Sequence, residues 1–180
     1  MAASLADLPE IKDCHAFNQA RWIELCADPA LAALDYRIET DRFGHILMSP
    51  PPSFEHSDRQ GQILEKLGQL MGGQGRARPE VPVSTADGVK AVDAAWISEE
   101  RLSSARHGQL LTVAPEICIE VLSPSNTRDE IEQKKRLYFQ AGAEEVWVCT
   151  LQGRMLFHRK EAPEIASGSQ MCPGFPVDLD

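Results

Sequence analysis

The residue that says most about chemistry is a carboxylate inside an apolar strand. Glu120 lies in the run ICIEVL at 117–122, and the absence of polar alternation there is typical of a strand buried on both faces. A buried carboxylate without a partner costs several kcal/mol or becomes protonated. We therefore expect a cation or hydrogen-bond donors beside Glu120.

A second carboxylate, Asp93, has a similar place in the run VKAVDAAWIS at 89–98. By itself, Asp93 could face solvent from one side of a hairpin. Two acids in two apolar strands instead favour a shared site, because Mg²⁺ binds one or two carboxylates together with waters and substrate oxygens. Glu80, in RPEVPV at 78–83, is a third candidate metal ligand, and the alternative is that its side chain is exposed.

The segment after Glu120 supplies a candidate cation. At about 100° per residue, its apolar side chains cover a helical arc of roughly 120°. The arc consists of Ile131, Leu137, Tyr138 and Ala141. Lys134 projects from within this arc and Lys135 lies at its edge, so Lys134 is predicted to reach the carboxylates. The alternatives are an ordinary lysine at the flank of the helix and a purely structural pair with Glu130, one turn earlier.

The remaining pattern places these residues on a small set of elements. The predicted helices cover 15–28, 54–71 and 127–142. The predicted hairpins cover 35–50, 76–98 and 145–159. Thr127 and Glu130 form a capping box at the start of the third helix, and 99–109 reads as a short helix or loop. This order predicts an α/β (α+β) fold with a mixed central sheet flanked by helices.

Length and composition fit one soluble domain. The 180 residues, 43% of them hydrophobic, suffice for a single core. The five cysteines are scattered and lack the close pairs of structural zinc sites, which favours a reducing compartment. Because the sequence shows no signal-peptide pattern and no run of ~18 apolar residues, we expect a cytoplasmic protein that makes no membrane contact. It should exist alone or as a small oligomer such as a homodimer.

The charge of the chain bears on its partners. A formal net charge of −9 argues against tight sequence-independent binding to nucleic acid, which depends on Lys and Arg. It does not exclude a nuclease, because such an enzyme holds several carboxylates for metal and can carry a local basic strip. DNA is therefore a partner that composition permits without indicating it.

Three segments together resemble a known family. They are MSPPPSFEH at 48–56, ADGVKAVDAAW at 86–96 and APEICIEVLSPSNTRDEIEQKKRLYFQAGAEEVWV at 114–148. They resemble the Uma-two family of restriction-endonuclease-like proteins, a bacterial branch of the PD-(D/E)XK nuclease superfamily, from about Asp35 to His158. The expected organisation is a helical extension at 1–34, a restriction-endonuclease-like domain at 35–160, and a tail at 161–180 that packs on the same domain.

The resemblance implies a role for individual residues. Asp93 and Glu120 would be the two motif acids, and Lys134 would be the motif lysine. In the parent motif the lysine comes two residues after the acid, where this chain has Leu122, so the lysine has moved to the next helix. His56 matches a position that usually holds histidine and is a candidate contact for the substrate phosphate. The alternative for His56 is a structural hydrogen bond.

The chain also departs from the family pattern. Val92 replaces the proline that precedes the motif aspartate, which affects strand entry more than chemistry because that proline binds nothing. His45 stands where relatives often carry an acid after the hairpin glycine. This difference argues against a contribution of the hairpin at 35–50 to the site.

The function implied by the resemblance is hydrolysis of DNA phosphodiester bonds by an endonuclease that depends on Mg²⁺ or Mn²⁺. Asp93 and Glu120, with Glu80, would bind the metal, and Lys134 would orient the attacking water. The alternative is a non-catalytic descendant, in which the nuclease fold is kept as a binding or oligomerisation module. An acidic composition would suit that alternative.

Overall fold

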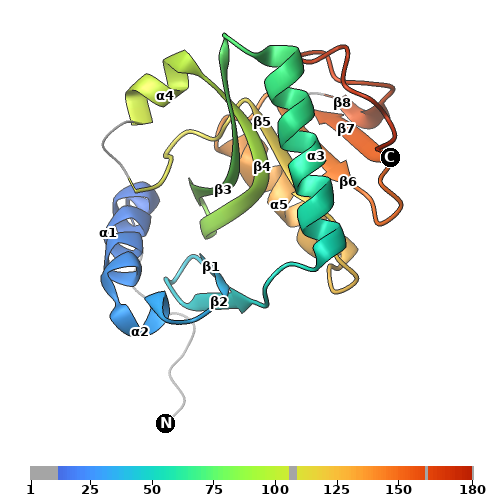
Figure 1. The fold of residues 1–180 in the computed structure, drawn as a ribbon. Coiled ribbons are helices and arrows are strands. Elements are labelled where there is room, and N and C mark those ends of the chain that lie inside the picture. Colours follow the sequence, from blue (N-terminus) through green and yellow to red (C-terminus); the bar gives the residue numbers. More distant parts are fainter. Residues whose placement is uncertain (1–11, 106–108, 161, 180) are drawn as a thin grey trace.

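A six-stranded mixed sheet forms the centre of the computed structural model, which describes residues 12–105, 109–160 and 162–179 (Figure 1). The strands, in their order across the sheet, are β3 (Gly75–Thr85), β4 (Gly88–Ser98), β5 (Ile117–Val121), β6 (Glu145–Cys149), β7 (Met155–Arg159) and β8 (Ala162–Ala166). Strands β5 and β6 pair in parallel, and the other neighbours pair antiparallel. The predicted mixed sheet is confirmed. Residues 1–11 of the expected helical extension and 106–108 of the predicted helix or loop lie outside the described ranges.

Helix α5 (Arg128–Gln140) makes the crossover that the parallel pair β5–β6 requires. The predicted capping box is confirmed, because Thr127 Oγ1 accepts a hydrogen bond from the Glu130 amide at 3.3 Å and the Glu130 side chain accepts one from the Thr127 amide. Tyr138 of α5 packs with Cys118 and Val146 on one face of the sheet. The capping box therefore fixes where α5 begins, and with it the position of Lys134 above β5.

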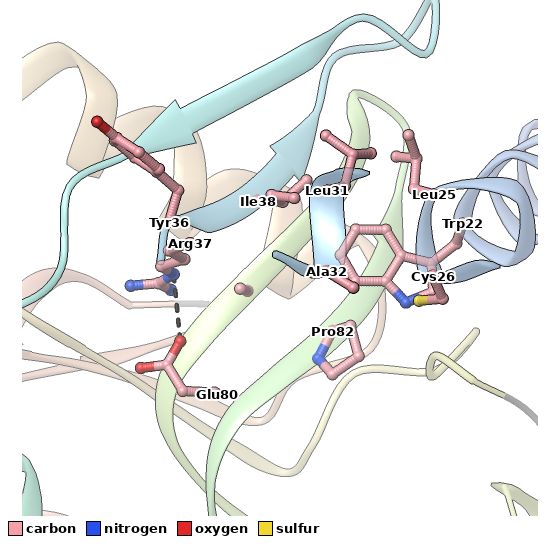
Figure 2. A pocket seen from close by; sticks show the side chains of 11 residues that line it. Trp22, Leu25, Cys26, Leu31, Ala32, Tyr36, Arg37, Ile38, Glu80 and Pro82 are labelled. Carbon is pink, nitrogen blue, oxygen red and sulfur yellow. Dashed lines mark ion pairs between the residues drawn. The ribbon is translucent and has the colours of Figure 1, made fainter. Parts of the chain in front are cut away.

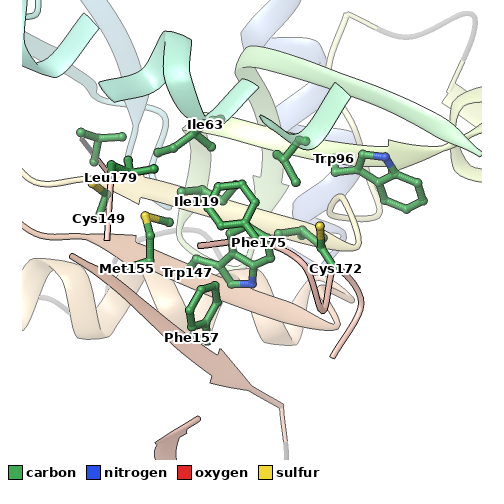
Figure 3. Close-up of a cluster of buried hydrophobic side chains, with 14 of the residues drawn as sticks. Ile63, Trp96, Ile119, Trp147, Cys149, Met155, Phe157, Cys172, Phe175 and Leu179 are labelled. Carbon is green, nitrogen blue, oxygen red and sulfur yellow. The ribbon is translucent and has the colours of Figure 1, made fainter. Parts of the chain in front are cut away.

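Helix α3 (Phe54–Met71) packs on the opposite face of the sheet (Figure 1), with the bounds that its hydrophobic period predicts. Its inward side chains are Ile63, Leu67 and Met71. They contact the aromatic centre of the core, where Trp147 meets Phe157 edge-on and lies 4.7 Å from Phe175, measured between ring centroids (Figure 3). Both faces of the central strands are thus covered, which explains why β5 lacks polar alternation.

The C-terminal segment, which was expected as a tail that packs on the domain, completes this core. It adds strand β8 beside β7 and the buried side chains of Cys172, Phe175 and Leu179. Glu145 ties the segment down: its carboxylate accepts hydrogen bonds from Ser169 Oγ and the amide of Gln170, each at 2.7 Å. The indole of Trp147 and the amide of Met171 also donate to Glu145. This buried acid is therefore fully satisfied and structural.

A separate two-stranded sheet, β1 (Arg37–Thr40) and β2 (Ile46–Ser49), lies beside the turn between β3 and β4 (Figure 1). Thr40 accepts hydrogen bonds from the Val89 amide and from Lys90 Nζ, both at 2.9 Å. Gly88 has a φ of +84°, and a Cβ there would lie 2.4 Å from the carbonyl oxygens of Thr40 and Asp41. The close approach of this hairpin to the main sheet therefore depends on glycine at 88.

The N-terminal region forms α1 (Cys14–Ala27) and α2 (Pro29–Ala32), and α4 (Glu99–Ala105) follows β4. Asn18 of α1 donates from its buried amide to Ser84 Oγ and to the Thr85 carbonyl, which fastens α1 to the end of β3. None of the helices among the described residues combines the length and the apolar character needed to cross a membrane.

We expect two glycine substitutions to change stability in opposite directions. Gly88→Ala should lower the free energy of unfolding by more than about 1–2 kcal/mol, because alanine at positive φ is strained and its Cβ meets two carbonyl oxygens. Gly61→Ala, in the interior of α3 with open space around the new methyl, should raise it by about 0.5–1 kcal/mol. Urea unfolding measures both changes. A neutral Gly88→Ala would contradict the close packing of the hairpin.

Candidate active site

The site lies where strands β4 and β5 separate. Their backbone pairing runs from Trp96 and Ile117 to Ala94 and Ile119 and then stops. At the next residue of β4, Asp93, a side chain replaces the backbone pairing. Its Oδ2 accepts a hydrogen bond from the Val121 amide of β5 at 2.7 Å. The diverging strands open a cavity of about 710 Å³. Every predicted site residue lines it: His56, Glu80, Asp93, Glu120 and Lys134.

Asp93 is buried and held at both carboxylate oxygens. Oδ1 pairs with the guanidinium of Arg37, and Oδ2 lies 3.4 Å from Nε2 of His56 in addition to its bond from Val121. Burial alone would raise the pKa of Asp93, but the contact with His56 and the charge of Arg37 lower it below its usual value. Asp93 is therefore ionised at neutral pH, as a metal ligand must be.

Glu120 has the partners that its position in a buried strand demands. Lys134 Nζ lies 3.1 Å from Glu120 Oε2, and the Tyr138 hydroxyl donates to Oε1 at 2.7 Å. Burial raises the pKa of Glu120 and the charge of Lys134 opposes that rise. Burial and the nearby Glu120 also raise the pKa of Tyr138 well above its usual value, so its hydroxyl stays protonated and can donate.

Lys134 bridges two carboxylates. Besides Glu120, its ammonium group contacts Glu39 Oε1 at 2.9 Å. Burial would lower the pKa of Lys134, but these two carboxylates raise it above its usual value, so the lysine is a permanent cation. The structure places the ammonium group of Lys134 beside Glu39 and Glu120, and among the described residues it shows no pair of Lys134 with Glu130. Lys135 points elsewhere and pairs with Glu132 at 2.8 Å.

His56 and Glu80 lie at the edges of the same group. His56 lies in the first turn of α3, after the N-cap Ser53, and its Nε2 faces Asp93. The hydrogen bond between His56 and Asp93 raises the pKa of His56 above its usual value. The side chain of Glu80 is about half exposed; it accepts from Gln60 Nε2 at 2.9 Å and pairs with Arg37 at 3.3 Å. The roles of His56 at a phosphate and of Glu80 at a metal stay predictions.

The hairpin β1–β2 contributes to the site, which corrects the expectation drawn from His45. Arg37 and Glu39 of β1 line the cavity, and Glu39 Oε1 also accepts from the Ala91 amide at 3.1 Å, which fixes it against β4. Two residues apart, Arg37 and Glu39 point to the same face of β1. In the sequence, the signal for these two residues is a pair of opposite charges on either side of Ile38.

The balance of charge in the site favours a hard divalent cation. Four carboxylates, those of Glu39, Glu80, Asp93 and Glu120, face two permanent cations. When the four acids are ionised, two negative charges are unbalanced with a neutral His56 and one with a protonated His56, whose pKa is raised by Asp93. Such oxygen donors fit Mg²⁺, which is held by one or two carboxylates and keeps several waters. Over the described ranges, no three His, Cys, Asp or Glu side chains form a ready-made metal site.

Comparison with known proteins agrees with this geometry. The sequence matches the Uma2 family, described as "Putative restriction endonuclease", over residues 24–170. The chain belongs to this family. No curated protein matches it. Among solved structures, the crystal structure of a "putative nuclease belonging to DUF820" from Anabaena variabilis has a TM-score of 0.62 and 19% sequence identity, over 72% of this chain and 74% of that one. The predicted family and fold class are both confirmed.

A second cavity, of about 290 Å³, adjoins the site of this Uma2 family member (Figure 2). Its walls are mostly apolar and come from α1, α2, β1, β3 and β4, with Trp22 and Leu25 on one side. Arg37 and Glu80, joined by their ion pair, line this cavity as well as the acidic one. The Arg37 side chain therefore stands between an apolar and an acidic compartment.

The two tyrosines of the chain provide a matched test of the Glu120 contact. Tyr138→Phe removes a buried donor to a carboxylate and should lower the free energy of unfolding by about 1.5–3 kcal/mol. Tyr36→Phe, at a half-exposed tyrosine, should change it by less than about 0.5 kcal/mol. Chemical denaturation followed by tryptophan fluorescence gives both values. Equal effects would argue against the hydrogen bond to Glu120.

Proposed function

We propose that this Uma2 family member is a Mg²⁺-dependent endonuclease that hydrolyses phosphodiester bonds in DNA. One observation carries the proposal: two strands that diverge bring Asp93 and Glu120 into one cavity, with the buried cation Lys134 at 3.1 Å from Glu120. Family membership supports the nuclease class, and the donor chemistry of the two acids supports a hard divalent metal.

Asp93 and Glu120, with Glu80 as a further candidate, would hold the metal. A bound Mg²⁺ supplies a lowered pKa for a coordinated water and charge stabilisation at the phosphate. Asp93 stays ionised through His56 and the Val121 amide, which keep its Oδ2 in place. Lys134 remains protonated and directs its ammonium group into the cavity, where it can orient water and offset charge on a phosphate oxygen.

Glu39 has a positioning role in this proposal. It holds Lys134 Nζ from the side opposite Glu120 and is itself held by the Ala91 amide. Because two carboxylates fix one ammonium group, Lys134 loses few further degrees of freedom when substrate binds. The hairpin β1–β2 thus holds Lys134 in place through Glu39. In the parent motif, the lysine lies on the same strand as the motif acid.

Metal binding tests the first half of the proposal. Calorimetric titration of the full chain with Mn²⁺ or Mg²⁺ should show binding that Asp93→Asn and Glu120→Gln each abolish without loss of fold, because each removes a charged oxygen donor. A millimolar dissociation constant still counts as binding. Circular dichroism serves as the control for folding. Binding that is unchanged in both variants would remove the metal from the proposal.

Cleavage tests the second half. Lys134→Met should lower the rate of DNA cleavage by about 10²–10³, the usual effect of losing one donor at a developing charge. Lys135→Met is the matched control: it removes a neighbouring lysine that pairs with Glu132 outside the cavity, and it should leave the rate nearly unchanged. Plasmid nicking with Mg²⁺ measures both. Inactivity of the unmodified chain with every divalent metal would favour the non-catalytic alternative.

A further inference from the structure

Arg37 lies at the centre of the cluster of acidic side chains to which a metal ion would bind. Its guanidinium pairs with Asp93, lies 3.3 Å from Glu80 through Nε, and lies 3.7 Å from Glu39 through Nη2. Only a fifth of the side chain is exposed. The neighbouring acids raise the pKa of Arg37 although burial opposes this, so the group is always charged. In this structure the counter-ion of Asp93 is therefore an arginine.

The guanidinium is held more by charge than by hydrogen bonds. Nη1 donates to Asp93 Oδ1, whereas Nε and Nη2 are buried and have no hydrogen-bond partner among the described residues. Buried donors without acceptors are costly. They are also suited to an added oxygen ligand, because arginine presents its N–H groups as a planar fork that matches the oxygens of a phosphate.

Arg37 and a divalent cation would compete for the carboxylate of Asp93. A divalent cation bound by Asp93 would lie within a few ångströms of the guanidinium, where like charges repel strongly in a partly buried site. Asp93 can release Oδ1 without losing its position, because Val121 and His56 hold Oδ2. Arg37 can leave Asp93 without leaving the cavity, because Glu80 contacts it at the cavity's edge.

We propose that Arg37 changes partner during the reaction cycle, from Asp93 in the metal-free protein to a phosphate oxygen of the DNA backbone once metal has bound. This step rests on the proposed function and adds a substrate-binding residue to it. The arginine neutralises the acids until metal replaces it, and the displaced fork then faces the phosphate beside the metal. The two donors that lack acceptors are those that the phosphate would satisfy.

The test combines metal affinity with cleavage in three variants of the full chain. Arg37→Met removes the competing charge, so Mn²⁺ should bind at least about tenfold more tightly in calorimetry without DNA. Plasmid cleavage by this variant should fall by about 10²–10³. Arg37→Lys keeps the charge and removes the fork, so Mn²⁺ affinity should stay within about threefold while cleavage still falls. Arg42→Met, at an exposed arginine that pairs with Asp87 outside the cavity, should change neither.

The outcomes separate this inference from the proposed function. Tighter Mn²⁺ binding by Arg37→Met in a chain that cuts no DNA would support the exchange at Asp93 and overturn the nuclease. Arg37→Met that unfolds without Mn²⁺ and refolds with it would also support the exchange, because the metal then replaces the lost charge. Unchanged or weaker Mn²⁺ binding in a folded Arg37→Met would overturn the inference, as would full cleavage by Arg37→Lys.

Discussion

The structure depends above all on neutralising carboxylates that lie away from bulk water. Glu120 sits in a strand covered on both faces, and it is tolerable there because Lys134 and Tyr138 meet its two oxygens. Removing one partner from a buried ion pair costs far more than an exposed pair contributes. This constraint links the parallel crossover, the capped start of α5 and the hairpin β1–β2, since each brings a group that satisfies an acid.

Local sequence patterns predicted most of the elements because these patterns follow from short-range geometry. The helix at 54–71, the capping box at Thr127 and the hairpin around 86–88 each depend on residues a few positions apart. The position of Lys134 on the buried face of its helix followed from helical periodicity in the same way. Together with the acids in two apolar strands, this periodicity predicted that Lys134 reaches the carboxylates, and the family resemblance then implied that Asp93, Glu120 and Lys134 belong to one motif.

What the sequence did not predict are contacts between distant segments. Arg37 and Asp93 are 56 residues apart, and Glu39 and Lys134 are 95 apart. Nothing local to Arg37 indicates that β1 lies across the end of β4, because that placement depends on Gly88 and on Thr40. Strand β8 was missed for a related reason: no local pattern in 162–171 indicates that 162–166 pairs with β7 or that 169–171 donates to Glu145.

The hold of Glu145 on the C-terminal segment also affects how the chain is made. Strand β6 lies in the interior of the sheet, yet three of the four groups that donate to the carboxylate of its first residue, Glu145, come from residues 169–171, and the fourth is the indole of Trp147. During synthesis, β5 and α5 are made before the residues that carry these three donors. Until residues 169–171 have been made, Trp147 is the one of these four donors that is present, so the hydrogen bonding of this buried carboxylate is completed only after the segment at 169–171 has been synthesised and has packed on the sheet.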